Sequence, residues 1–171
     1  MENALFVVNM QEMYVGKFRK KEKISYDAEE LTAKVNKRIL AYQPEEVFFI
    51  KSVGKGLFKG TMPKEGTKDA ELLAYLKYLS NSKNVFEKNK SDCFSNNVLH
   101  DFIRSRGVKQ IEFIGVDTGE DIGKTAITAT EDMSIHAVYN EAALVSLDPE
   151  KSGKLRSKLR RSRVTYKNDL D

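Results

Sequence analysis

The sequence has very little cysteine and histidine and no long apolar run. Its single cysteine, Cys93, excludes an internal disulfide and is typical of proteins from reducing compartments. No apolar stretch approaches the ~20 residues that a membrane-spanning helix needs. The first residues, MENALFVVNMQ, have an acid at position 2, no basic segment and only a short apolar run, unlike a signal peptide. We therefore expect a cytoplasmic protein that does not enter a membrane.

The composition is that of a globular protein, with 40% hydrophobic and 32% charged residues in 171 positions. This length predicts a single domain, 1–171, with a basic C-terminal segment at about 150–171. The net charge of +4 is unevenly placed, because residues 154–163, KLRSKLRRSR, include six cations, and a second basic run occupies 17–23. Such runs can bind nucleic acid, acidic lipids or anionic substrates, and they are also typical of a solvated helix face.

Short apolar segments alternate with amphipathic ones along the whole chain. The predicted strands are 4–10, 46–52, 84–88, 110–116, 134–140 and, as the weakest of the six, 142–147. The predicted helices are 27–42, 69–79, 95–107, 120–133 and 149–163. This alternation predicts a three-layer α/β fold, a doubly wound parallel sheet with helices on both faces. The loop at 53–68, with four glycines, is expected to be the most mobile segment.

Residues 118–125, TGEDIGKT, are close in sequence to a phosphate-binding P-loop. A P-loop needs a glycine where this chain has Thr118, because its backbone N–H groups must surround a phosphate. Glu120 and Asp121 would also place two negative charges beside that phosphate. We therefore interpret the segment as a strand that leads into a helix with acids in its first turn.

Three segments, in this order, resemble the isochorismatase-like hydrolases, a superfamily that also contains nicotinamidases and other cysteine amidohydrolases. They are ALFVVNMQ (4–11), GTKDAELLAYL with NVFEKNKSDCFSNNVLHDFI (66–103) and IEFIGVDTGEDIGKTA (111–126). The resemblance implies a six-stranded parallel sheet flanked by helices, in agreement with the predicted order of elements. It also implies homo-oligomers, dimers or tetramers, and a small-molecule substrate.

The catalytic triad of that superfamily is Asp–Lys–Cys, and by position it corresponds here to Asn9, Lys88 and Asp121. Only the lysine is kept. Asn9 has no titratable proton and so cannot act as a general acid or base. Asp121 has no thiol, so a thioester intermediate is excluded, and Cys93 falls outside the nucleophile position and is interpreted as a small buried residue.

The resemblance also implies residues around the reacting centre. It places Gln11, Phe94, Val116, Asp117 and Thr118 at the substrate and a non-proline cis peptide at Val116–Asp117. No metal and no other cofactor are expected, because the Asp-x-His pair with which nicotinamidases bind a metal is absent from FFIKSVGKG, residues 48–56. The two histidines, His100 and His136, are expected in a helix and a strand and are interpreted as packing or surface residues.

Two hypotheses about function stay open at this point, and a third is less well supported. The first is a hydrolase of small molecules, of the C–N or ether bond class, in which Asp121 is base or nucleophile, Lys88 its electrostatic partner and Asn9 a substrate-orienting group. Basic residues near the site, including Lys51 and Lys55, suggest an anionic substrate. The second is a catalytically inactive relative that binds a metabolite or a protein. A nucleic-acid or acidic partner for residues 154–163 ranks last, since only Tyr166 lies nearby to stack on bases.

Overall fold

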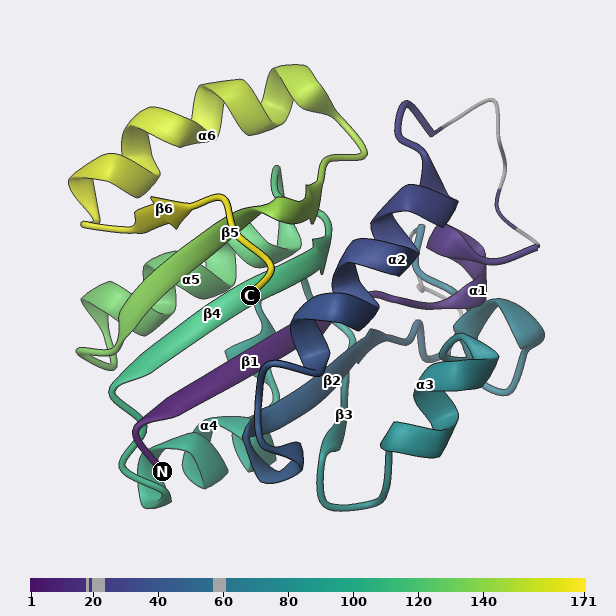
Figure 1. Ribbon diagram of the computed structural model, residues 1–171, viewed down its shortest axis with the longest axis horizontal. Coiled ribbons are helices and arrows are strands. Elements are labelled where there is room, and N and C mark those ends of the chain that lie inside the picture. The colour runs from purple at the N-terminus through teal and green to yellow at the C-terminus, as the bar shows by residue number, and fades with distance from the viewer. Residues whose placement is uncertain (18, 20–23, 57–60) are drawn as a thin grey trace.

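A six-stranded, all-parallel sheet forms the centre of the protein, in the order β3-β2-β1-β4-β5-β6 (Figure 1). The computed structural model describes residues 1–17, 19, 24–56 and 61–171. The strands are β1 Asn3–Val8, β2 Val47–Ser52, β3 Val85–Lys88, β4 Gln110–Val116, β5 His136–Val145 and β6 Thr165–Lys167. The predicted α/β doubly wound fold is confirmed.

Helices cover both faces of this sheet. They are α1 Glu12–Val15, α2 Ala28–Ile39, α3 Ala74–Leu79, α4 Asn97–Ser105, α5 Asp121–Glu131 and α6 Pro149–Arg161. One face packs on α1, α2 and α3 through an apolar cluster that includes Leu31, Val35 and Leu76. The other face packs on α4, α5 and α6 through a cluster that includes Leu99, Ile122 and Leu159. None of these helices, within the described ranges, is long and apolar enough to cross a membrane.

The helix predicted at 69–79 begins later than expected. Residues 68–70 form a single 3-10 turn, and α3 starts only at Ala74. Between them the chain is extended, since Leu72 makes an antiparallel bridge with Gln11 and the Leu73 N–H donates to the Met10 carbonyl at 3.1 Å. Pairing with the segment after β1 therefore overrides the local helical preference. By contrast, α2 begins as predicted, with the Asp27 side chain accepting from the Glu29 and Glu30 N–H groups.

The predicted sixth strand at 142–147 is wrong as a separate element. It is the second half of β5, which runs without a break from His136 to Val145. Against β4, Phe113 pairs with Tyr139 and Gly115 pairs with Leu144, so β5 has three extra residues in that interval and bulges outward. This bulge brings the exposed Glu141 to the surface and makes one strand look like two. The sixth strand of the sheet is instead β6, only three residues long, near the C-terminus.

The sheet changes direction of winding between β1 and β4, because β2 and β3 lie on one side of this pair and β5 and β6 on the other. In open α/β sheets, ligands bind at such a switch point, outside the carboxyl ends of the strands. The two strands are very close there. Gly115 has φ +107°, and a Cβ at this position would lie 2.2 Å from the Val8 carbonyl oxygen, so no larger residue fits. The glycine loop 53–68, predicted to be mobile, lies partly outside the described residues.

Candidate active site

Four polar side chains meet at the carboxyl edge of the sheet, beside the switch point. Asn9 directly follows β1, Ser52 ends β2, Lys88 ends β3, and Asp121 is the first residue of α5, which follows β4. Parallel strands align their carboxyl ends, so residues far apart in the sequence come within hydrogen-bond distance. The structure thus brings together the three predicted residues Asn9, Lys88 and Asp121, and it adds Ser52.

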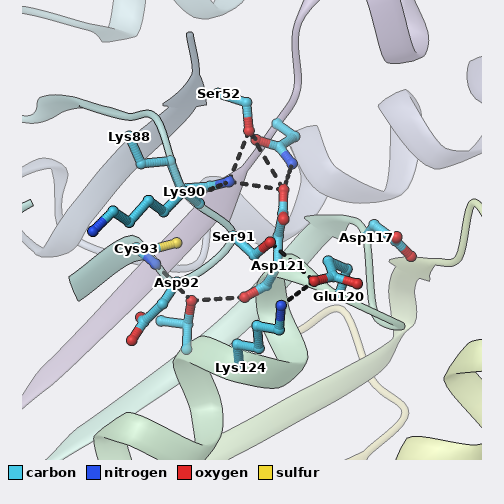
Figure 2. A network of polar contacts seen from close by, with 12 residues as sticks. Ser52, Lys88, Lys90, Ser91, Asp92, Cys93, Asp117, Glu120, Asp121 and Lys124 are labelled. Carbon is cyan, nitrogen blue, oxygen red and sulfur yellow. Dashed lines mark hydrogen bonds and ion pairs between the residues drawn. The ribbon is translucent and has the colours of Figure 1, made fainter. Parts of the chain in front are cut away.

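Lys88 and Asp121 form a buried ion pair (Figure 2). The Lys88 Nζ donates to Asp121 Oδ2 at 2.8 Å, to Ser52 Oγ at 2.7 Å and to the Lys90 carbonyl at 3.3 Å. The Lys88 side chain is 0% exposed and that of Asp121 is 12% exposed. Three acceptors thus match the three N–H donors of this buried side chain.

Asn9 completes the network from the other side. Its Nδ2 donates to Asp121 Oδ2 at 2.5 Å, and its Oδ1 accepts from Ser52 Oγ at 2.8 Å. Asn9 has φ 54°, in the left-handed region that asparagine tolerates better than most residues. This backbone turn at the end of β1 directs the amide toward Asp121. Asn9, Ser52, Lys88 and Asp121 thus form a closed ring of hydrogen bonds, which we call the polar ring.

The two oxygens of the Asp121 carboxylate differ sharply. Oδ2 accepts from Lys88 and Asn9, and Ser52 Oγ lies 3.4 Å away. Oδ1 has no hydrogen-bond partner among the described residues. The backbone N–H groups of Asp117, Glu120 and Asp121, at the start of α5, also have no acceptor in that part of the chain. One carboxylate oxygen and several backbone donors are therefore free at the same helix N-terminus.

The predicted cis peptide at Val116–Asp117 is present. Asp117 Oδ1 accepts from the N–H groups of Gly119 and Leu147 at 3.0 Å and from Ser146 Oγ at 3.1 Å. Burial raises the pKa of Asp117, and these three hydrogen bonds oppose that effect. The Asp117 carboxylate points away from Asp121 (Figure 2), so its visible role is to fix the loop before α5.

Thr118, Gln11 and Phe94 lie around the polar ring without joining it. The Thr118 hydroxyl contacts Ser152 Oγ of α6 at 2.8 Å. The Gln11 amide donates to the carbonyls of Ser52 and Ala70 and accepts from the Ser52 N–H, so it holds β2 beside the chain that follows β1. Phe94 is 6% exposed and packs on Phe6 in the core. Their predicted contacts with a substrate remain predictions.

Cys93 is completely buried, as expected, and follows Lys88 by five positions in the sequence. Burial raises the pKa of its thiol to about 12, which outweighs the opposite effect of the Lys88 charge. The thiol is therefore protonated near neutral pH. A protonated thiol is a poor nucleophile, so Cys93 does not replace the missing cysteine of the triad.

Two of the lysines that suggested an anionic substrate, Lys51 and Lys55, are paired with acids. Lys51 lies 3.1 Å from Glu87, and Lys55 lies 3.4 Å from Glu65 and 3.5 Å from Glu87. At the start of α5, Glu120 accepts from Ser91 Oγ and forms ion pairs with Lys124 and Lys151. The basic run at 17–23 lies mostly outside the described residues.

The resemblance to nicotinamidases raises the question of a metal site, which the described residues answer. Among residues 1–17, 19, 24–56 and 61–171, no group of three or more His, Cys, Asp or Glu side chains could hold a metal ion. His136 bonds instead to Gln110 and to Thr165 on neighbouring strands. The side chains in this part of the chain do not fit a metal site.

Sequence reasoning found three members of the polar ring and missed Ser52. A signal for Ser52 was available, because it is the last residue of the second predicted strand, at the edge where the other three were expected. It was missed because serine at a strand end is common and no motif named it. Its hydroxyl links Asn9 to Lys88, which no sequence spacing indicates.

Comparisons with known proteins agree with this fold. An isochorismatase domain model matches residues 3–152. An isochorismatase-like hydrolase from Alkaliphilus metalliredigens shares 15% identity with a TM-score of 0.77, over 96% of this chain and 93% of that one. A pyrazinamidase/nicotinamidase from Streptococcus mutans shares 21% identity with a TM-score of 0.79, over 97% and 100%. N-carbamoylsarcosine amidase from Thermoplasma acidophilum shares 19% identity with a TM-score of 0.74, over 98% and 96%.

No curated protein matches the chain by sequence. The solved structures share too little identity to indicate more than the fold. The domain model, however, covers most of the chain, including every member of the polar ring. The chain therefore belongs to the isochorismatase family.

Proposed function

We propose that the protein hydrolyses a C–N or related bond of a small molecule, with Asp121 activating the attacking water. The observation that carries this proposal is the asymmetry of the Asp121 carboxylate. Lys88 and Asn9 hold Oδ2 at 2.8 and 2.5 Å, while Oδ1 has no partner among the described residues. The names of the structural neighbours, nicotinamidase and N-carbamoylsarcosine amidase, are those of enzymes that cleave such bonds.

In the proposed reaction, Asp121 Oδ1 removes a proton from a water molecule. The resulting hydroxide attacks the carbonyl carbon of the substrate and forms a tetrahedral oxyanion. Free backbone N–H groups at the start of α5 donate to that oxyanion. When the C–N bond breaks, the leaving amine takes the proton from Asp121, so the carboxylate is regenerated and no external reactant is consumed besides water.

Lys88 and Asn9 have supporting roles in this mechanism. The Lys88 ammonium holds the Asp121 carboxylate through Oδ2 and so leaves Oδ1 free to accept the proton from water. Asn9 fixes the carboxylate by a hydrogen bond and exchanges no proton itself. The aspartate is thus moved from the end of β1 to the start of α5 relative to the family triad, and the thiol is lost.

A hydrolysis screen tests this proposal. Purified protein is offered amides, ureido acids, esters and an enol ether, in parallel with Asp121→Ala, Lys88→Ala and the surface control Tyr78→Phe, whose side chain is 90% exposed. We expect turnover of one class that is lost in the first two variants and kept in the control. Turnover that persists in Asp121→Ala would contradict the proposal.

A second candidate is a binding protein without catalysis. The observation in its favour is the polar ring itself, in which Asn9 cannot titrate and the carboxylate already has partners for one oxygen. On this view, the double substitution of Asn9→Asp and Asp121→Cys should restore a thiol-based triad and create amidase activity absent from the wild type. Turnover by the wild type that depends on Asp121 would exclude this candidate.

The predicted assembly and partners also belong to the proposal. We expect a cytoplasmic homo-oligomer, a dimer or tetramer, which light scattering of the purified protein would reveal as a multiple of 19.5 kDa. A nucleic-acid partner for α6 has weak support, because Lys151, Lys154 and Arg156 are paired with Glu120, Glu150 and Glu141. Binding to nucleic acid would show a steep loss with added salt.

A further inference from the structure

The chain that follows β3, residues 90–93, runs alongside the first turns of α5 (Figure 2). Hydrogen bonds join this segment to the helix at three places: Ser91 to Glu120 at 3.0 Å, Cys93 to Thr125 at 2.9 Å and Asp92 to Thr128 at 2.7 Å. The segment begins just after Lys88, and the helix begins with Asp121. These contacts therefore connect the two parts of the chain that carry the ion pair.

The middle contact differs from the other two, because it also reaches the backbone of Asp121. The Thr125 hydroxyl accepts from the Cys93 N–H at 2.9 Å and donates to the Asp121 carbonyl at 2.7 Å. Thr125 and Cys93 are both 0% exposed, and the Cys93 N–H has no other acceptor among the described residues. A hydroxyl can donate and accept at once, so this one side chain satisfies both groups.

The ion pair and the Thr125 hydroxyl hold Asp121 by two different routes. Through its side chain, Asp121 Oδ2 accepts from Lys88 Nζ at 2.8 Å, and the same Nζ donates to the Lys90 carbonyl at 3.3 Å. Through its backbone, Asp121 is tied by Thr125 to Cys93, five residues after Lys88. The chain from Lys88 to Cys93 and the threonine bridge thus close a loop around the ion pair. Within this loop, the position of the Asp121 backbone relative to Lys88 depends on the Thr125 hydroxyl.

We propose that Thr125 is a positioning residue, which sets the place of Asp121 against Lys88. Valine has nearly the same shape as threonine, but it would leave the buried Cys93 N–H without an acceptor. The segment after β3 and the first turn of α5 would then move apart, and the ion pair would weaken. The consequence for catalysis rests on the proposed hydrolysis, because there Asp121 Oδ1 must meet a water molecule. The effect on the ion pair depends only on contacts within the free protein.

A double-mutant cycle between Thr125→Val and Lys88→Met tests this role without any substrate. If the inference holds, the ion pair is already weakened in Thr125→Val, so adding Lys88→Met should lower the urea midpoint by only about half as much as in the wild type. Thr130→Val is the matched control, since its hydroxyl donates within α5 to the Ala126 and Ile127 carbonyls at 3.0 Å. The shifts of Thr130→Val and Lys88→Met should add. Thr125→Ala takes the place of the valine variant in the cycle if that variant does not fold.

Turnover of a substrate identified by the hydrolysis screen tests the consequence for catalysis. We expect Thr125→Val to lower kcat about tenfold and to leave KM unchanged, because a completely buried hydroxyl is not available to a substrate. Thr125→Ser, which keeps the hydroxyl, should restore kcat, and Thr130→Val should match the wild type. Additive midpoint shifts for Thr125→Val and Lys88→Met would overturn the proposal, and so would a wild-type kcat in Thr125→Val. If the wild type turns over no substrate, the proposed hydrolysis fails and the cycle alone decides the role of Thr125.

Discussion

Replacing Glu112 by glutamine should strongly destabilise the protein without touching the polar ring. Glu112 lies in the middle of β4 on the face covered by α2 and is 1% exposed. Its carboxylate accepts from the Arg38 Nε and Nη2 at 2.8 and 2.9 Å, from the Tyr42 hydroxyl and Asn140 Nδ2 at 2.8 Å, and from Lys167 Nζ at 2.6 Å. The single Glu112 carboxylate thus accepts hydrogen bonds from two cationic and two neutral side chains.

The size of the effect depends mainly on Arg38. The Arg38 side chain is 9% exposed, so water cannot solvate its guanidinium when Glu112 becomes neutral. Lys167 is 25% exposed and can be partly rehydrated. Removing one partner of a buried pair costs about 3–5 kcal/mol, and Arg38 would keep only the half-exposed Asp169 carboxylate, 3.8 Å away, as a counter-charge. We expect Glu112→Gln to lower the free energy of unfolding by that amount.

Urea unfolding followed by circular dichroism measures this effect. With a slope of about 2 kcal/mol per molar urea, the midpoint should fall by roughly 1.5–2.5 M. Glu71→Gln, which removes a carboxylate from an exposed cluster with Lys68 and Lys77, should leave the midpoint nearly unchanged. Equal shifts for the two variants would refute the reasoning that burial makes the difference.

The same variant has a pH signature. Burial raises the pKa of Glu112, but the hydrogen bonds from Arg38, Lys167, Asn140 and Tyr42 outweigh it and hold the pKa below its ordinary value. A folded pKa below the unfolded value near 4.3 gives stability that is present above about pH 4.3 and lost as pH falls through the folded pKa. The difference in stability between wild type and Glu112→Gln should therefore be constant near neutral pH and shrink in acid.

Three further predictions concern the sheet and the polar ring. Gly115→Ala should lower the free energy of unfolding by about 3 kcal/mol or more, because of its positive φ and the clash with Val8. Gly153→Ala, on the open surface of α6, should be neutral or stabilising, and urea unfolding of the two variants measures the difference. Asn9→Asp places two carboxylates where a 2.5 Å hydrogen bond was, so they must share a proton, and thermal unfolding should show a larger loss of stability at pH 8 than at pH 5. Lys88→Met should lower the free energy of unfolding by about 3 kcal/mol, and adding Asp121→Asn should recover part of that loss. If the double variant lost as much unfolding free energy as the two single variants together, the result would contradict a direct pair.

The sheet was predictable because its strands are nearly continuous apolar runs that period and length identify. The strand predictions that failed concern the strands with irregular pairing, β5 and β6. The bulge in β5 inserts Glu141 into an apolar run, and the pattern of the sequence cannot tell a bulge from a turn. The strand β6 has three residues, too few for any alternation to register. The start of α3 is delayed because Leu72 pairs with Gln11. These residues are 61 positions apart, so local helix propensity cannot predict the contact.

The site was predictable in part for a different reason. Lys88, Asn9 and Asp121 were found because each occupies a position in a recognisable motif. The cluster around Glu112 was not found, although a charged residue in the middle of an apolar strand was a visible signal of a buried partner. The partners themselves, Arg38 and Lys167, come from a helix and an edge strand, so only the three-dimensional arrangement identifies them.

The polar ring also has a consequence for the order of events in folding. Its contacts join residues 36, 33, 43 and 112 positions apart, and they require β1, β2, β3 and α5 to be in place together. Such contacts form late, after the loops between the strands have closed. Substitutions in the ring should therefore speed unfolding and leave the folding rate almost unchanged. The polar ring therefore slows unfolding of the assembled sheet. A substitution that alters the chemistry of the site also shortens the lifetime of the native state.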